Sequence, residues 1–288
     1  MTPFGRQLAD YLRAIPPGSR LRLAPTPSGY LHTGNALNFL LNWTAARTTG
    51  ASVLLRIDDL DADRKRPEYV QDIFSSLEWL GINWDEGPRS AADFEQNWSQ
   101  HLRLPIYETL LERLRQTGLL FACRKSRSDL ASFEGLYPPE FRNQSCSLDD
   151  PDVAWRIKTP EGFPMPDFVV RRRDGLPAYQ IASLADDLHF NATHIIRGVD
   201  LEPSTLAQRY LAECLEEKSF MAIRFLHHPL LTDSEGNKLS KSAGAAALSA
   251  LRQGGAVDVF GQVAAALGWP FAASASDLLR VAETYVHK

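Results

Sequence analysis

The sequence predicts an α/β protein built on a parallel, Rossmann-like sheet. An apolar run at 21–24 is followed by a turn with two prolines and two glycines, and then by an apolar segment at 36–47 that reads as a helix. A second short, β-rich run follows at 53–57. A strand, a helix and another strand within about forty residues indicate a βαβ unit with a right-handed crossover.

The rest of the chain is predicted from similar patterns. Apolar residues recur at helical spacing in 67–80, and helices are also predicted at 7–14, 105–117 and 204–216. Short apolar or alternating runs predict strands at 119–122, 153–158, 168–172, 194–196 and 224–231, with a hairpin turn at Asp174–Gly175. The stretch 123–151 is polar and interrupted by glycine and proline, whereas 243–288 is Ala-rich with helical character.

This order of elements divides the chain. We expect a nucleotide-binding domain at 1–245, interrupted at about 105–190 by a mixed α+β insertion, and a short helical C-terminal segment at 246–288.

Composition indicates a globular protein that is not a general nucleic-acid binder. The 288 residues are 44% hydrophobic and 23% charged, with a net charge of −4, so any RNA contact must come from a local basic patch. No long apolar run predicts a membrane span, and the N-terminus lacks a signal core, so we expect a cytoplasmic protein. The three widely spaced cysteines fit a reducing compartment and form no metal-binding pair.

One stretch has the character of a phosphate site, and a second stretch carries two closely spaced lysines. A strand, a glycine-containing turn and a helix N-terminus form a natural phosphate site, and His32 lies inside that turn. Far downstream, Lys238 and Lys241 lie three apart on a polar loop. Each stretch also has an ordinary interpretation, as a tight turn with a stray histidine and as a solvated loop.

Charged residues at the predicted strand ends are the next candidates. Arg22 and Arg197 each stand at a strand end, where they are either pocket residues or surface arginines. Four aspartates, at 58, 59, 61 and 63, follow the strand at 53–57. Ligands bind beyond the carboxyl ends of parallel strands, so Asp58 is the candidate, and we expect the other three to form a solvated acidic turn.

Taken together, the motifs resemble a known family. His32-Thr33-Gly34-Asn35 and the segment 238–242 (Lys-Leu-Ser-Lys-Ser) resemble the HIGH and KMSKS signatures of class I aminoacyl-tRNA synthetases. The segments 22–34, 56–61 and 80–88 are similar, in order, to motifs of glutamyl-tRNA synthetases, and the likeness runs from about 20 to about 245. In length, and at 167–179, the chain is similar to their shorter paralogues, the glutamyl-queuosine tRNA(Asp) synthetases.

The resemblance implies a class I synthetase catalytic domain and a set of site residues. The implied catalytic residues are His32, Lys238 and Lys241. The implied ATP-binding residues are Pro25, His32, Gly34, Asn35, Leu239 and Lys241. The implied glutamate-binding residues are Arg22, Leu23, Ala24, Pro25, Thr26, Asp58, Tyr179 and Arg197.

The resemblance also implies the reaction. ATP, with Mg²⁺, would activate glutamate without tRNA, and glutamate would pass to queuosine in the anticodon of tRNA(Asp). The implied protein is a monomer with an acceptor-binding insertion, no membrane contact and no anticodon-binding domain. Two alternatives stay open: a glutamate-activating ligase with another acceptor, and a non-catalytic paralogue that binds RNA or protein.

The sequence departs from the family pattern at several positions. Asn35 replaces the last histidine of HIGH, Thr26 stands for the usual Ser, and Asp58 stands for the usual Glu. Many members bind zinc through Cys-x-Cys and Tyr-x-x-x-Cys, but here those positions hold Cys123, Lys125, Tyr137 and Phe141, and Cys146 does not fit the spacing. One thiolate cannot complete a tetrahedral site, so we predict no zinc and an insertion held by packing.

Overall fold

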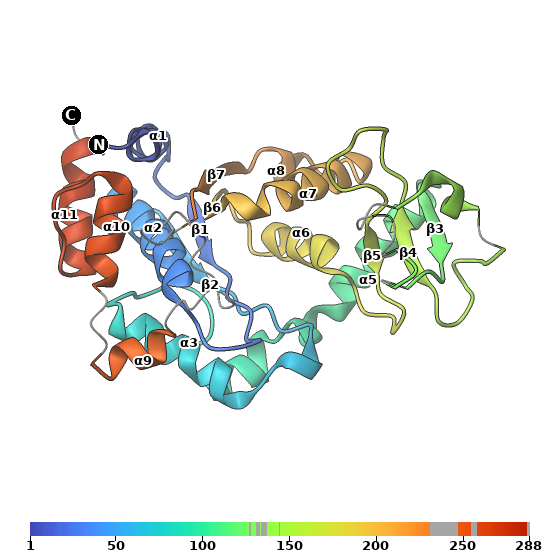
Figure 1. The fold of residues 1–288 in the computed structure, drawn as a ribbon, viewed down its shortest axis with the longest axis horizontal. Helices are drawn as coiled ribbons and strands as arrows, with labels where there is room; N and C mark the ends of the chain where they lie inside the picture. The colour runs from blue at the N-terminus through green and yellow to red at the C-terminus, as the bar shows by residue number, and fades with distance from the viewer. Residues whose placement is uncertain are drawn as a thin grey trace. The chain divides into compact units, whose positions relative to one another are not determined.

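The computed structural model describes residues 1–126, 128–130, 133, 137–143, 145–230, 247–254 and 258–286, which form two compact units (Figure 1). The first unit takes residues 1–101, 192–200 and those from 223 onward. The second unit takes residues 102–191 and 201–222. The second unit therefore enters the chain of the first at two places.

The first unit contains two pairs of parallel strands. β1 (Arg20–Leu23) pairs with β2 (Ser52–Leu55), and β6 (His194–Gly198) pairs with β7 (Arg224–His228). β6 starts beside β1, where the N–H of Thr193 donates to the Arg20 carbonyl at 3.0 Å. The four strands therefore share a direction, and their carboxyl ends meet at the edge where such sheets bind ligands. The predicted α/β class is confirmed.

The first unit also contains helices. In the part of the first unit that the structure describes, they are α1 (Pro3–Arg13), α2 (Thr33–Thr49), α3 (Pro67–Trp79), α4 (Ala91–Asp93), α9 (Leu248–Arg252), α10 (Val259–Leu267) and α11 (Ala275–Val286). α2 is buried on most of its circumference and packs on β1, β2 and β6. It ends at Gly50, whose φ of 71° is left-handed, as expected for a glycine C-cap.

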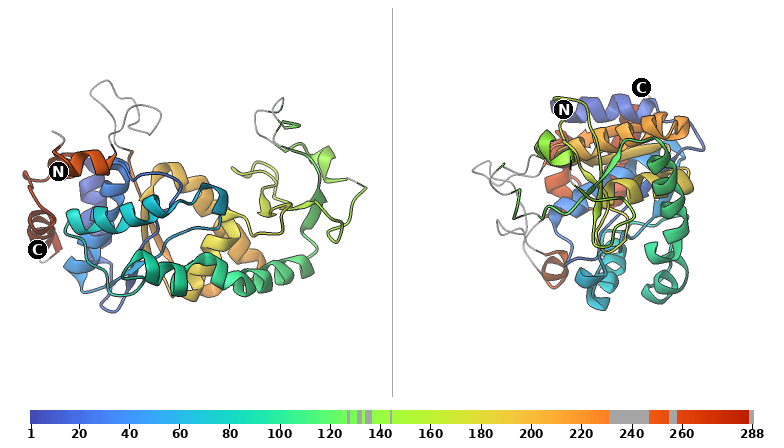
Figure 2. Two further views of the ribbon diagram at one scale, coloured as in Figure 1. Left: turned by 90° about the horizontal axis from the view of Figure 1, so that it is seen from below. Right: turned by 90° about the vertical axis from the view of Figure 1, so that its right-hand side faces the viewer.

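The last two helices are part of the core of the first unit. α10 and α11 lie beside α1 and α2, as Figure 1 and the left view of Figure 2 show. Leu267 and Leu278 are each 1% exposed and belong to the same apolar cluster as Leu37 and Leu40 of α2. The helical character predicted for the C-terminal segment is confirmed, and the segment completes the core rather than lying on its surface.

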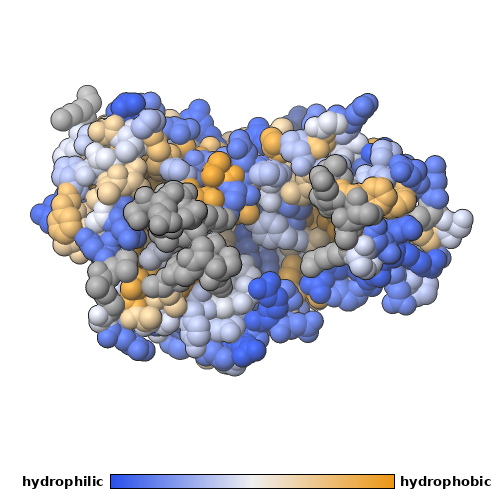
Figure 3. All heavy atoms as spheres, in the orientation of Figure 1, coloured by the Kyte–Doolittle hydropathy of each residue, from blue (hydrophilic) through white to orange (hydrophobic). Residues whose placement is uncertain are grey.

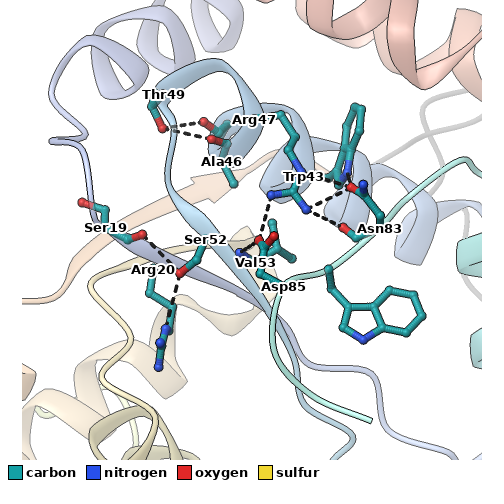
Figure 4. A network of polar contacts seen from close by, with 12 residues as sticks. Ser19, Arg20, Trp43, Ala46, Arg47, Thr49, Ser52, Val53, Asn83 and Asp85 are labelled. Carbon is teal, nitrogen blue, oxygen red and sulfur yellow. Dashed lines mark hydrogen bonds and ion pairs between the residues drawn. The ribbon is translucent and has the colours of Figure 1, made fainter. Parts of the chain in front are cut away.

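A polar network joins the end of α2 to the start of β2 (Figure 4). Asp85 accepts hydrogen bonds from Arg47 Nη1 and from the Val53 N–H, both at 2.7 Å. Asn83 Oδ1 accepts from Trp43 Nε1 at 2.8 Å and from Arg47. Partial burial alone would raise the pKa of Asp85, but the bonds from Arg47 and the Val53 N–H hold it below its usual value. The family-like segment 80–88 thus serves to fix the βαβ unit.

The second unit combines an antiparallel sheet with helices. Its sheet has the order β3 (Leu120–Cys123), β4 (Ala154–Ile157), β5 (Val169–Arg171). Its helices among the described residues are α5 (Leu104–Gln116), α6 (Tyr179–His189), α7 (Glu202–Cys214) and α8 (Lys218–Met221). The predicted turn at Asp174–Gly175 is present, with the Arg172 N–H donating to the Leu176 carbonyl at 2.7 Å.

A buried ion pair fixes α6 to the start of α5. Asp186, which is 0% exposed, accepts from Arg103 Nε at 2.8 Å and Nη2 at 3.1 Å, and from the Tyr107 hydroxyl at 2.8 Å. The Arg103 guanidinium also lies 5.1 Å from the centroid of the Phe190 ring. This bidentate pair gives the helical part of the second unit one defined packing.

The predicted boundaries differ from the observed ones by a few residues. The first helix was predicted to start at Gln7 but starts at Pro3, because Thr2 caps it by accepting a hydrogen bond from the Gly5 N–H at 3.0 Å. Proline is well suited to the first turn, where its missing N–H is not needed.

The described part of the chain contains no helix that is both long and apolar enough to cross a membrane. The face drawn in Figure 3 is mostly hydrophilic, and its apolar residues gather in separate patches.

Candidate active site

The turn after β1 is fixed by the backbone of the segment after β2. The Pro25 carbonyl accepts a hydrogen bond from the Asp58 N–H at 2.9 Å. Leu23 and Pro25 are buried, Ala24 is half-buried and Thr26 is exposed. The two strand ends therefore stay together as the chain leaves the sheet, and Thr26 faces away from the core.

His32 is the N-cap residue of α2. Its Nδ1 accepts a hydrogen bond from the Gly34 N–H at 3.1 Å, and Asn35 Oδ1 accepts from the His32 N–H at 3.0 Å. These two bonds form a capping box, which satisfies groups that the helix start leaves unpaired. Asn35, at the position of the last signature histidine, therefore has a structural role at the helix start.

The cap also determines which imidazole nitrogen carries the proton. Because Nδ1 of His32 accepts a hydrogen bond, the proton of the neutral ring is on Nε2, which can donate to an anion. A Cβ at Gly34 would lie 3.0 Å from His32 Cε1, so only glycine lets the ring rest on the first turn without displacement. The ring and the N–H groups of the first turn are suited to bind phosphate oxygens together.

Arg22 and Arg197 are both buried, at 5% and 3% exposure. Each stands one residue before the end of its strand, Arg22 in β1 and Arg197 in β6. The Arg197 guanidinium lies 4.9 Å from the centroid of the Phe225 ring on β7. The interpretation of these residues as surface arginines is therefore wrong. Buried guanidinium groups at this edge of a sheet are suited to bind a carboxylate.

Asp58 forms a bidentate ion pair with Arg56, a residue that the sequence reasoning did not single out. Arg56 Nε and Nη2 donate to the two carboxylate oxygens at 2.7 and 3.0 Å. The side chains are 2% and 9% exposed. The pair fixes the orientation of the Asp58 carboxylate, whose oxygens can each accept more than one hydrogen bond.

Asp59 corrects a prediction: it is 1% exposed and does not belong to a solvated acidic turn. Its carboxylate accepts from the Ser99 hydroxyl and the Gln100 N–H, both at 2.8 Å, and from Lys65 Nζ at 3.1 Å. These partners fix the loop that carries Asp58. Asp61 is half-buried and Asp63 is exposed, so the prediction fails at Asp59.

Two asparagines of α2 bind the backbone of β6. Asn42 is 0% exposed, and its amide donates to the Ile196 carbonyl at 2.9 Å and accepts from the Ile196 N–H at 3.4 Å. Asn38 donates to the same carbonyl at 2.9 Å. The helix that starts at His32 is thus attached to the strand that carries Arg197. The only signal in the sequence was a pair of asparagines four apart on an apolar helix.

Lys238, Leu239 and Lys241 lie outside the described residues, but the segments on either side of them are described. Upstream, His228 Nε2 at the end of β7 lies 3.3 Å from Asn38 Nδ2 of α2. Downstream, Ala247 forms an antiparallel bridge with His32, and the Leu248 N–H donates to the Leu31 carbonyl at 2.8 Å. The upstream flank is therefore attached to α2, and the downstream flank to the turn before it.

Tyr179 belongs to the second unit, where it is the first residue of α6 and 43% exposed. The N–H of Ala178, just before it, donates to the Val170 carbonyl at 2.8 Å. The start of α6 is therefore attached to β5.

The four positions at which many family members bind zinc do come together in the second unit. The Tyr137 hydroxyl lies 3.2 Å from Cys123 Sγ and 3.0 Å from the Phe141 carbonyl oxygen. Lys125 Nζ lies 4.7 Å from the centroid of the Phe141 ring. Burial and the neighbouring Cys123 thiol raise the pKa of the Tyr137 phenol. An ammonium group and a phenyl ring in place of two thiolates do not fit a zinc ion. No group of three metal-binding side chains occurs among the residues that the structure describes.

The fold and this site define a class I aminoacyl-tRNA synthetase. The family model for class I tRNA synthetases of the E and Q type, catalytic domain, matches residues 19–134 and 140–271, and the chain belongs to this family.

Individual relatives are similar to this chain over most of its length. The chain is 40% identical over 257 residues to the glutamyl-Q tRNA(Asp) synthetase of Parasynechococcus marenigrum, covering 87% of this chain and 83% of that protein. It is 35% identical over 283 residues to the protein of that name from Nitratidesulfovibrio vulgaris, covering 86% of each.

Among solved structures, the chain is similar to the glutamate-tRNA synthetase of Elizabethkingia anophelis, with a TM-score of 0.65 and 28% identity. The match covers 79% of this chain but 53% of that one, so this chain spans about half the length of that synthetase.

Proposed function

We propose that this protein uses ATP to activate glutamate as glutamyl-adenylate without tRNA, and then transfers glutamate to queuosine in the anticodon of tRNA(Asp). In the first step the α-carboxylate of glutamate attacks the α-phosphorus of ATP and pyrophosphate leaves. In the second step a hydroxyl of the acceptor attacks the activated carbonyl and AMP leaves. Relatives named glutamyl-Q tRNA(Asp) synthetase, 35–40% identical over most of this chain, support the choice of substrates.

One observation carries this proposal. The two flanks of the lysine-bearing stretch, at His228 and at Ala247, attach to α2 and to His32 respectively. The chain between these anchors holds Lys238 and Lys241. This supports a shared role of the two motifs on one triphosphate at the helix N-terminus. A solvated loop and a stray histidine would require no such attachment.

The phosphate half of the site would act by electrostatics. His32 Nε2–H and the first N–H groups of α2 bind phosphate oxygens, and Lys238 and Lys241 neutralise the charge that develops as pyrophosphate leaves. Pro25 and Gly34 let the ATP approach the backbone of the turn, whereas Asn35 acts through the capping box. Leu239 completes the ATP site. Mg²⁺ reaches the site on the triphosphate and is held mainly by phosphates and waters.

The amino-acid half of the site would recognise two charges of glutamate. Arg22 and Arg197 bind the side-chain carboxylate, since both guanidinium groups are buried at the carboxyl edge of the sheet. Asp58, held by Arg56, accepts from the substrate ammonium. The backbone of 23–26 lines the pocket. The second unit binds the acceptor RNA, and the protein acts as a monomer.

Pyrophosphate exchange without tRNA tests the activation step. We expect glutamate-dependent exchange of labelled pyrophosphate into ATP, abolished in Lys241→Ala. Aspartate, which has a shorter side chain, is the control amino acid. It is included because Asp58 has a shorter stem than the Glu usual in the family, so the preference for glutamate needs its own test. Absence of exchange with every amino acid at high enzyme concentration would refute the enzyme claim.

The acceptor is tested separately. Total tRNA with and without queuosine is incubated with the protein, ATP and glutamate, and its nucleosides are analysed by mass spectrometry. We expect glutamate attached to queuosine only in the queuosine-containing sample. Exchange activity without this product would favour a different acceptor.

A further inference from the structure

The helix that follows the lysine-bearing stretch is attached to the backbone of the His32 turn. Ala247, the residue before α9, pairs with His32 in an antiparallel bridge. The Leu248 N–H donates to the Leu31 carbonyl at 2.8 Å. These contacts are between main chains, so they do not themselves explain why α9 lies at this place.

Two side chains supply that explanation. Asp72 of α3, which is 4% exposed, accepts a hydrogen bond on Oδ2 from the Leu31 N–H at 3.1 Å. Its other oxygen, Oδ1, accepts from Arg252 Nη2 of α9 at 2.8 Å. Arg252 Nη1 donates to the Ser76 hydroxyl, also of α3, at 2.5 Å. One buried carboxylate therefore joins the peptide before His32 to the helix after the lysines.

The energetics favour a single geometry for this connection. The side chains of Asp72 and Arg252 are 3% and 21% exposed, so Asp72 without Arg252 would be a buried carboxylate that has lost its ionic partner. The guanidinium uses two different nitrogens for two acceptors on α3, which fixes its direction as well as its charge. A displacement of α9 would break both bonds at once.

We propose that Asp72 and Arg252 are positioning residues for adenylate formation, which hold the His32 turn and the downstream end of the lysine-bearing stretch in register. This inference rests on the proposed function. Neither residue needs to touch a substrate. Their effect reaches ATP through the backbone at Leu31 and Ala247. A small displacement of the groups that bind ATP is enough to lower the catalytic rate strongly.

The test replaces Arg252. In Arg252→Ala we expect kcat for pyrophosphate exchange to fall and KM for ATP to rise, for a loss of about ten- to a hundredfold in kcat/KM for ATP. KM for glutamate should change by less than about twofold, since Arg22 and Arg197 are untouched. Arg252→Lys should recover part of the loss, because one ammonium keeps the charge but replaces only one of the two directed bonds.

A matched control removes an arginine from the same C-terminal segment. Arg280 of α11 pairs with Asp277, and its side chain is 74% exposed. Arg280→Ala should leave all kinetic constants as in the wild type. If Arg252→Ala lowered the melting temperature but left kcat and KM for ATP unchanged, the residue would be structural only and the proposal would be overturned.

Two further measurements need no turnover, so they separate this inference from the proposed function. Titration of ATP by calorimetry should show about tenfold weaker binding to Arg252→Ala than to the wild type. Hydrogen exchange should accelerate at the Leu31 and Leu248 amides together. If the wild-type protein lacked pyrophosphate-exchange activity but these two results held, Asp72 and Arg252 would still be shown to position the ATP site, and only the proposed reaction would fail. Unchanged ATP affinity and unchanged protection would refute it. If Arg252→Ala did not fold, Arg252→Lys would be measured in its place.

Discussion

The imidazole of His32 accepts a hydrogen bond from the Gly34 N–H, so one nitrogen of the ring caps α2 while the other carries the proton. The same side chain therefore has a structural task and a chemical one. Substitutions can separate the two, because several residues cap a helix but do not present an imidazole N–H.

Asparagine at position 32 separates capping from donation. His32→Asn keeps a side-chain oxygen for the Gly34 N–H but loses the Nε2–H donor, so we expect a stability close to that of the wild type and a fall of about 10²–10³ in kcat for exchange. His32→Ala should lose the cap as well, which costs about 1 kcal/mol of stability. Thermal unfolding and exchange kinetics on both variants measure the two effects. Equal activity of His32→Asn and the wild type would show that the imidazole does not act on phosphate.

Asp59 provides a test of the loop that carries Asp58. Asp59→Asn keeps the shape but weakens the bonds to Ser99 and Lys65, and we expect a loss of about 1–3 kcal/mol in the free energy of unfolding. In pyrophosphate-exchange assays, KM for glutamate should rise more than KM for ATP, because the loop carries Asp58 of the proposed amino-acid site. The exposed Asp63→Asn is the matched control. A denaturant titration that showed equal stability for the two variants would contradict the buried role of Asp59.

Buried histidines predict acid sensitivity of the first unit. Burial lowers the pKa of His228 and of His194 below the ordinary value of 6.5, although the Pro229 carbonyl opposes this at His228. A histidine with a lowered folded pKa binds its proton more readily in the unfolded state. Its contribution to stability is complete above about pH 6.5 and is lost as the pH falls to the folded pKa, by at most about 1.4 kcal/mol per pH unit for each residue.

His228→Gln removes one of these titrations and keeps an amide that can bond to Asn38. Unfolding free energies measured from pH 7.5 to 5 should therefore fall less steeply for this variant than for the wild type. An identical slope would mean that His228 does not stay neutral in the folded protein.

The cluster of Cys123, Lys125, Tyr137 and Phe141 predicts a second unit that needs no metal. Purified protein treated with a strong chelator should keep its melting temperature, and metal analysis should find less than one zinc per chain. Tyr137→Phe removes the hydroxyl that lies near Cys123 Sγ and the Phe141 carbonyl, at an expected cost of about 1 kcal/mol. Unfolding on chelation would show that a metal stabilises the second unit after all.

A structural feature can be predicted from the sequence when the interactions that determine it lie between residues close together in the chain. β1, α2 and β2 were predictable because apolar patterning, prolines and glycines act over a few residues. Arg22 and Arg197 could be placed at strand ends from the sequence, but only the structure shows that both are buried. Asp59 was misjudged, because it stands among three other aspartates and two of its partners, Ser99 and Gln100, lie about forty residues further on.

The residues that were not singled out have partners that the local sequence does not reveal. Arg252 is separated from Asp72 by 180 positions, and nothing near either residue marks it as half of a pair. Arg56 directly follows the apolar strand β2, and pairing with a carboxylate two positions away makes its burial tolerable. Chemistry at strand ends and helix starts can thus be found by pattern, whereas the supports of that chemistry depend on contacts distant in sequence.

The placement of α10 and α11 in the core beside α1 has a consequence for synthesis on the ribosome. The core of the first unit contains apolar side chains of α1 and of α10 and α11, so it cannot close until residues 259–286 have been synthesised. The second unit, made of residues 102–191 and 201–222, emerges complete earlier. The second unit should therefore fold before the first, and residues 1–101 should stay exposed to chaperones until α11 has been made.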